Sequence, residues 1–213
     1  MNRHTDIPTA LHPEHADKSH PILVNLEKYW QALRHAQRIP SRNDIEPRQI
    51  DDALPHAFIL QRVAPGVARM RVAGQRLHDL LKMDARGMPI STFFDPDAHT
   101  DIAQLIEDAF STPSIVTIPL VSAGNLLRHE VTGTMLLLPL RDGKGDTTRI
   151  LGALVAEGNV GHRPRRFQIR KDAPLRNEPL IPRLASTQSI PRPGNAKRPH
   201  PSGPALRNVV NNG

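Results

Sequence analysis

Residues 95–122 read DPDAHTDIAQLIEDAFSTPSIVTIPLVS, and this stretch decides the fold. Asp95 offers a side-chain acceptor at a helix start, and Pro96 suits the first helical position. The apolar residues that follow recur at the spacing of one helix face: Ile102, Leu105, Ile106, Ala109 and Phe110. Pro113 ends this pattern, and residues 114–122 are apolar and rich in β-branched side chains, which favour strands. The stretch therefore predicts a long amphipathic helix that leads directly into a strand.

Two further strands are predicted after this stretch, over residues 128–140 and 149–157. The turns AGN and DGKGD, which contain glycine, separate the three strands from one another. Pro119 and Pro139 lack the backbone N–H that a central strand needs, so we expect them at edges, bulges or strand ends. The three strands together predict an antiparallel meander.

A hairpin and two helices are predicted before this stretch. Residues 57–63 read as a strand that begins with the apolar run AFIL. Residues 69–72 alternate polar and apolar side chains, and the tight turn APGV lies between the two strands. A short amphipathic helix follows around residues 77–81, and an earlier helix begins at Pro21 with an apolar stripe that reaches Leu33. Along the sequence, the short helix and the long helix therefore lie between the hairpin and the three-stranded meander. This order predicts an α+β domain with helices on one face of an antiparallel sheet, preceded by an N-terminal helix.

The net charge of +7 is distributed unevenly along the chain. Residues 162–213 hold eleven basic residues against two acidic ones, so this segment carries +9 and the remainder carries −2. The same segment is rich in proline and has one aromatic residue, so it cannot bury enough apolar surface to offset the entropy lost on ordering. We therefore predict a disordered lead over residues 1–20, one folded domain over 21–160, and a disordered basic, proline-rich tail over 161–213.

The composition excludes several classes of protein. The chain has no cysteine, which rules out disulfides, thiolate metal sites, a cysteine nucleophile and a cysteinyl photoadduct. No apolar run approaches the ~18–20 residues of a membrane-spanning helix. The first twenty residues lack the apolar core of a secretory signal. A cytoplasmic location is therefore the expectation.

A series of short motifs accompanies the elements in the same order along the chain. They are Tyr29-Trp30, Pro40-Ser41-Arg42, Asp44-Ile45, Leu54-Pro55-His56, Phe58-Ile59-Leu60, Arg71-Val72-Ala73-Gly74, Leu138-Pro139-Leu140 and Ile150-Leu151-Gly152. Over about residues 24–157, this series resembles the stand-alone PAS-domain proteins that are common in alphaproteobacteria. The resemblance implies a five-stranded antiparallel sheet of order 2-1-5-4-3. It also implies a non-enzymatic sensory or regulatory module of bacterial signal transduction.

PAS domains bind small ligands between the long helix and the sheet, so the resemblance implies a candidate ligand pocket there. Its lining residues would be Phe58, Leu60, Phe93, Phe94, Ile106, Phe110, Met135 and Leu137. Apolar residues at these spacings more often form a packed core without a ligand. Nothing in the sequence requires a cofactor.

Histidines are the other candidates, as ligands of haem or of a metal ion. His99 lies on the long helix, where haem-binding PAS domains carry a histidine, but it precedes the apolar stripe and is better read as an exposed residue. Four histidines in residues 1–20 could be taken for a metal tract, but coordination needs ligands held on a rigid frame. We therefore predict no metal site.

Other polar residues favour structural roles. Arg42 and Asp44 could bind a ligand, but they more simply fix the turn after the first helix, with Asp44 bonding to backbone groups. Nothing places Asp79, Asp84 and Glu130 together as acid and base, and no nucleophile has a partnered base. We therefore predict no catalytic residue.

Two hypotheses about partners follow. In the first, the domain acts through contacts with signalling proteins, with a homodimer as one such arrangement and a small ligand as a further regulator. In the second, the protein is an electrostatic adaptor whose basic tail, residues 162–213, binds nucleic acid or an anionic membrane without specificity. The tail lacks the aromatic side chains that would stack on bases.

Overall fold

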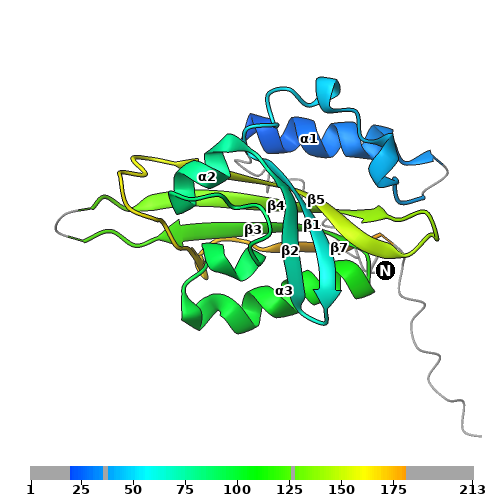
Figure 1. The fold of residues 1–213 in the computed structure, drawn as a ribbon. Helices are drawn as coiled ribbons and strands as arrows, with labels where there is room; N and C mark the ends of the chain where they lie inside the picture. The colour runs from blue at the N-terminus through cyan, green and yellow to red at the C-terminus, as the bar shows by residue number, and fades with distance from the viewer. Residues whose placement is uncertain (1–19, 36–37, 126–127, 181–213) are drawn as a thin grey trace, which may run out of the picture. The chain divides into compact units, whose positions relative to one another are not determined.

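The computed structural model describes residues 20–35, 38–125 and 128–180 (Figure 1). The helices are α1 (Pro21–Ala32), α2 (Gln75–Leu81) and α3 (His99–Ser111). The strands are β1 (Ala57–Ala64), β2 (Val67–Ala73), β3 (Ser114–Ser122), β4 (Val131–Arg141), β5 (Thr147–Glu157), β6 (Gln168–Ile169) and β7 (Arg176–Pro179). Short 3₁₀ helices span Arg42–Asp44, Pro47–Gln49, Ile90–Phe93 and Pro96–Ala98. None of the helices in this part of the chain is long and apolar enough to cross a membrane.

The strands form one antiparallel sheet of order β2-β1-β5-β4-β3-β6, and β7 also pairs with β3. The first five strands have the order 2-1-5-4-3, which confirms the fold predicted from the resemblance. The register sets Leu60 of β1 opposite Ile150 of β5, and Leu154 of β5 opposite Met135 of β4. These four apolar side chains belong to the same buried cluster, so they share one face of the sheet.

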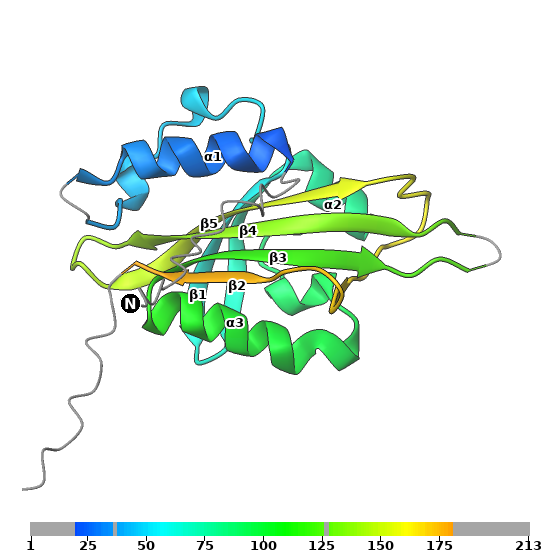
Figure 2. The same ribbon diagram turned by 180° about the vertical axis from the view of Figure 1, so that it is seen from behind.

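The two faces of the sheet are covered by different helices (Figures 1 and 2). Strand β4 contains the run Met135–Leu138, which is apolar at every position and therefore buries side chains on both faces. One face packs against α2 and α3. The other face packs against α1, through Leu23, Leu26 and Trp30. The predicted fold, with helices on one face of the sheet and a separate N-terminal helix before them, is confirmed, and α1 covers the second apolar face of β4.

Residues 161–180 belong to the folded domain, so the predicted end of the domain at residue 160 is wrong. Phe167 is fully buried in the cluster beneath α3, although it is the only aromatic residue after position 160. Strand β6 pairs with the end of β3 at Leu120 and Val121, and β7 pairs with its beginning at residues 114–117. This segment satisfies the hydrogen-bonding edge that β3 would otherwise expose. Residues 1–19 and 181–213, which make up the predicted lead and the rest of the predicted tail, lie outside the described residues.

Both strand prolines occupy the kind of position that was predicted. Pro119 lies in the interval between the β6 and β7 pairings, and its carbonyl accepts a hydrogen bond from the Arg170 amide at 2.9 Å. Pro139 lies beyond Leu137, the last residue of β4 that pairs with β3. In each case the missing N–H falls where no regular ladder bond is required.

Candidate functional site

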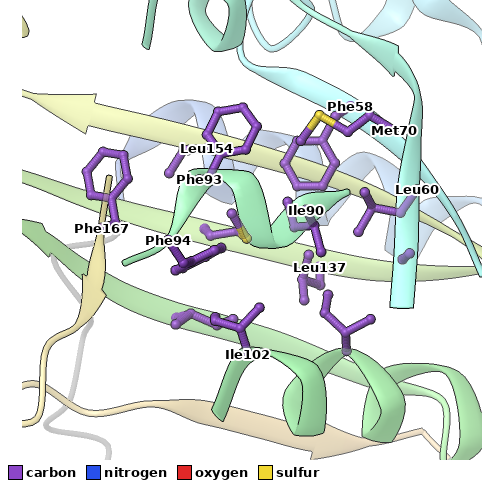
Figure 3. Packing of buried hydrophobic residues seen from close by; sticks show 14 of the residues in the cluster. Phe58, Leu60, Met70, Ile90, Phe93, Phe94, Ile102, Leu137, Leu154 and Phe167 are labelled. Carbon is purple, nitrogen blue, oxygen red and sulfur yellow. The ribbon is translucent and has the colours of Figure 1, made fainter. Parts of the chain in front are cut away.

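The eight residues predicted to line a ligand pocket are brought together in one buried cluster between α3 and the sheet. Their sources are β1 for Phe58 and Leu60, the 3₁₀ segment for Phe93 and Phe94, α3 for Ile106 and Phe110, and β4 for Met135 and Leu137. Each side chain is at most 3% exposed. Figure 3 shows five of them, Phe58, Leu60, Phe93, Phe94 and Leu137, converging on the same interior. Their grouping follows the sequence pattern, whereas their role in binding a ligand stays a prediction.

Aromatic rings of the chain itself occupy this interior. A Cβ atom added to Gly152 of β5 would lie 2.2 Å from the nearest atom of the Phe58 ring. The ring therefore lies where any larger residue at position 152 would project. Phe167, which the sequence analysis placed in the tail, contributes a further ring (Figure 3). The site that the resemblance implied for a ligand is thus lined and largely filled by the same aromatic side chains.

The other residues considered from sequence have structural partners. The Nε2 atom of His99 lies 3.2 Å from the Phe94 carbonyl oxygen, and His99 is exposed, as predicted. Asp44 accepts a hydrogen bond from the Ser41 amide at 2.7 Å, which confirms that it fixes the turn after α1. Bonds from Arg86 hold the pKa of Asp84 at about 2. Within the described ranges, no group of three or more histidine and acidic side chains could hold a metal ion. All but the last residue of the histidine-rich lead lies outside those ranges.

A second candidate site, which the sequence analysis missed, is a groove on the opposite face of the sheet. It has a volume of about 430 Å³ and lies between α1, β3 and β4. Its lining residues are Leu23, Val24, Glu27, Lys28, Gln31, Thr117, Leu136 and Arg176. We call this the α1 groove. Leu23 and Leu136 make its floor apolar, while its rim carries charges of both signs.

Strand β7 completes the rim of the α1 groove. The Arg176 Nη1 atom lies 2.8 Å from Glu27 Oε2 on α1, and its Nη2 atom lies 2.5 Å from Glu178 Oε2. The ion pair with Glu27 joins the first helix to the last strand, which are 149 residues apart. The only sequence signal for this site was the amphipathic pattern of α1, because Arg176 lay in a segment that was predicted to be disordered.

An antiparallel sheet of order 2-1-5-4-3 with a helical layer over a filled interior defines the class of fold. The sequence profile of the PAS domain family matches residues 18–155. The chain therefore belongs to the PAS domain family. The comparison with curated proteins returned no match.

Several solved structures resemble the chain at low sequence identity. A light-oxygen-voltage domain studied with a flavin analogue is 16% identical, with a TM-score of 0.37 over 53% of this chain and 84% of that chain. The dark structure of the blue-light photoreceptor Aureochrome1 LOV is 16% identical, with a TM-score of 0.38 over 52% of this chain and 80% of that chain. An RNA-binding light-oxygen-voltage receptor is 14% identical, with a TM-score of 0.35 over 72% of this chain and 36% of that chain.

Proposed function

We propose that this chain is a non-enzymatic, cytoplasmic PAS-type regulatory module that acts by binding another protein. The observation that carries the proposal is the packing of Phe58 over Gly152, together with four further buried phenylalanines in the same interior. A small ligand would have to displace these rings before it could bind. Contacts at the surface, in contrast, need no such rearrangement.

The α1 groove is the surface that suits a protein partner. Leu23 and Leu136 in its floor are already buried, but the half-buried Val24 and the methylene stem of the exposed Lys28 still offer apolar surface that gains free energy when it is removed from water. Its rim carries Glu27 beside Lys28 and Arg176, so it presents both signs of charge within a short distance. A surface of mixed sign can be complementary to its own copy across a two-fold axis. A homodimer that buries the α1 groove is therefore the first arrangement to test.

Native mass spectrometry and light scattering of the full chain test this arrangement. Val24 lines the α1 groove, whereas Val72 on β2 lies away from it and is 48% exposed. We expect Val24→Glu to weaken dimerisation about tenfold or more, and Val72→Glu to leave it unchanged. A wild-type protein that is monomeric at about 100 µM would overturn the dimer. An apolar small molecule retained in the native mass spectrum would contradict the filled interior.

The electrostatic-adaptor hypothesis rested on eleven basic residues in one disordered tail, and the folded segment up to residue 180 removes part of that support. Six of the eleven basic residues in 162–213 lie in the folded segment up to residue 180. Arg165 is buried, and Arg170 and Arg176 form ion pairs with Asp172 and Glu27. The hypothesis now depends mainly on five basic residues in 181–213.

Comparing the full chain with a chain that ends at residue 180 tests the adaptor hypothesis. If residues 181–213 bind DNA, the binding should be weak, independent of sequence and lost with the tail. It should also weaken with salt by about 0.9 log units per log unit of salt for each phosphate contact. A preference for one duplex that survives physiological salt would instead indicate a DNA-binding protein.

A further inference from the structure

A pocket rich in basic side chains lies where the β3–β4 turn meets the segment that follows β5. It has a volume of about 470 Å³, and Arg128, His129, His162, Arg163 and Arg165 contribute to its lining. We call it the basic pocket. Its lining contains three arginines and no aspartate or glutamate. It is separate from the interior cluster and from the α1 groove.

Arg165 is the deepest of these residues, with 2% of its surface exposed. Its Nε atom donates to the Val160 carbonyl at 2.9 Å, Nη1 to the His129 carbonyl at 2.9 Å, and Nη2 to the Asn159 carbonyl at 2.8 Å. These carbonyls orient the guanidinium, but they do not neutralise its charge. Desolvation, followed by repulsion from Arg128, lowers the pKa of Arg165, which is the sign of a cation without a counter-ion.

Among the described residues, no carboxylate forms an ion pair with the neighbouring arginines either. Arg128 donates from Nη2 to the Pro164 carbonyl at 2.9 Å. Among the residues that the structure describes, no salt bridge includes Arg128, Arg163 or Arg165. The folded segment pairs other arginines closely, as in Arg170 with Asp172 at 2.9 Å. Within the described part of the chain, the positive charge of these three arginines is therefore not compensated by a carboxylate, and all three line the same pocket.

We propose that the basic pocket binds a small anion that carries a phosphate group. Guanidinium groups match the oxygens of phosphate with paired hydrogen bonds. A pocket of this volume falls within the range of ~300–1,000 Å³ that is typical of small-molecule sites, so it has room for a group attached to the phosphate. The bound anion supplies the counter-charge that the buried Arg165 lacks, since a buried charge is costly unless it is compensated. This proposal is independent of the α1 groove and of any dimer.

The bound anion would stabilise the fold at a junction of three segments. Arg165 connects the β3–β4 turn, the end of β5 and the C-terminal segment through the three carbonyls. The same segment then enters the core, where the Phe167 amide donates to the Phe93 carbonyl at 2.8 Å. Ligand binding at this junction should therefore raise the thermal stability of the whole domain.

The test uses inorganic phosphate, pyrophosphate and ADP as probes, each compared with sodium chloride at equal ionic strength. Thermal unfolding and titration calorimetry of the full chain report binding. The test variant is Arg163→Gln, and the matched control is Arg166→Gln, three residues along, which is exposed and does not line the pocket. We expect wild type and Arg166→Gln to bind alike, and Arg163→Gln to bind about tenfold more weakly, because one charge-assisted hydrogen bond is lost.

Arg128→Gln provides a second variant and should weaken binding to a similar extent. Tighter binding of ADP than of pyrophosphate would identify the ligand as a nucleotide. Equal binding would show that the phosphate groups alone are recognised. The proposal is overturned if no phosphate compound acts differently from chloride, or if Arg163→Gln and Arg128→Gln both bind as well as wild type.

Discussion

Replacing Gly152 with alanine tests whether the interior beneath α3 is packed or open. The new Cβ atom would lie 2.2 Å from one atom of the Phe58 ring and 2.3 Å from the next. Carbon atoms in contact are normally about 3.5–4.0 Å apart, so the ring would have to move by roughly 1.3 Å or more. Phe58 is fully buried, and its neighbours would have to move with it. Overpacking of this kind costs about 1–3 kcal/mol of unfolding free energy.

The cause of this cost can be isolated with a second substitution. Phe58→Ala alone should cost about 3–5 kcal/mol, because it leaves a cavity. In the double variant, the alanine methyl at position 152 enters the space that the ring has left. The cost of the double variant should therefore be smaller than the sum of the two single costs by about 1–3 kcal/mol.

Urea unfolding followed by fluorescence and circular dichroism measures these differences. Trp30, the single tryptophan, lies on α1, is fully buried against the sheet and reports on tertiary structure. Gly143→Ala is the control, because a Cβ at that position meets no atom within 4 Å, and it should change the free energy by less than about 0.5 kcal/mol. A Gly152→Ala variant as stable as the control, or costs that simply add, would refute the packed interior and favour a cavity open to a ligand.

Three further predictions concern the outer face, the C-terminal segment and pH. Trp30→Phe should lower the free energy of unfolding by at least about 1–3 kcal/mol, measured with urea. The indole N–H donates to the Pro139 carbonyl at 3.1 Å, and this buried acceptor would lose its partner. A loss below about 0.5 kcal/mol, as for a surface substitution, would contradict this. A chain that ends at residue 160 should be less stable than one that ends at residue 180 by at least about 3 kcal/mol. It loses the buried Phe167 and both strands that cover the edge of β3. Equal melting curves would show that residues 161–180 do not stabilise the domain. Burial lowers the pKa of His56, so its contribution to stability is complete above the unfolded value of about 6.5 and declines as the pH falls below that value. His56→Gln should therefore reduce the loss of stability between about pH 7.5 and 5.5, and identical pH profiles would exclude this role.

The order of the elements could be predicted because it depends on local patterns. Asp95-Pro96 and the apolar stripe through Phe110 specify α3, and the glycine-containing turns separate the three strands of the meander. The structure brings the candidate pocket residues together in one cluster for the same reason, whereas their role in binding a ligand stays a prediction. The two-residue period of strand side chains sets Phe58 with Leu60, and Met135 with Leu137, on one face of the sheet, and the helical spacing on α3 directs Ile106 and Phe110 to the same interior. The role of Asp44 was also readable, since its hydrogen bond spans only three residues.

The basic pocket could not be predicted from sequence. Its arginines are Arg128, Arg163 and Arg165, and the last two lie in a segment that looks like part of a basic tail. Only the folded chain sets this segment beside the β3–β4 turn. Arg165 there contacts His129, which is 36 residues away in the sequence. The α1 groove is similar, because Glu27 and Arg176 meet only when β7 pairs with β3.

The sequence by itself determined where α3 and the strands from β1 to β5 lie, because periodicity and turn chemistry act over a few neighbouring residues. Which helix covers each face of the apolar run in β4 was decided only by the tertiary structure. When a strand is apolar on both faces, its sequence does not specify which element packs on either face. The tertiary structure also decided that residues 161–180 fold as part of the domain. Strands of two and four residues have almost no apolar surface of their own, and they form because the edge of β3 offers hydrogen bonds that only a segment distant in sequence can satisfy.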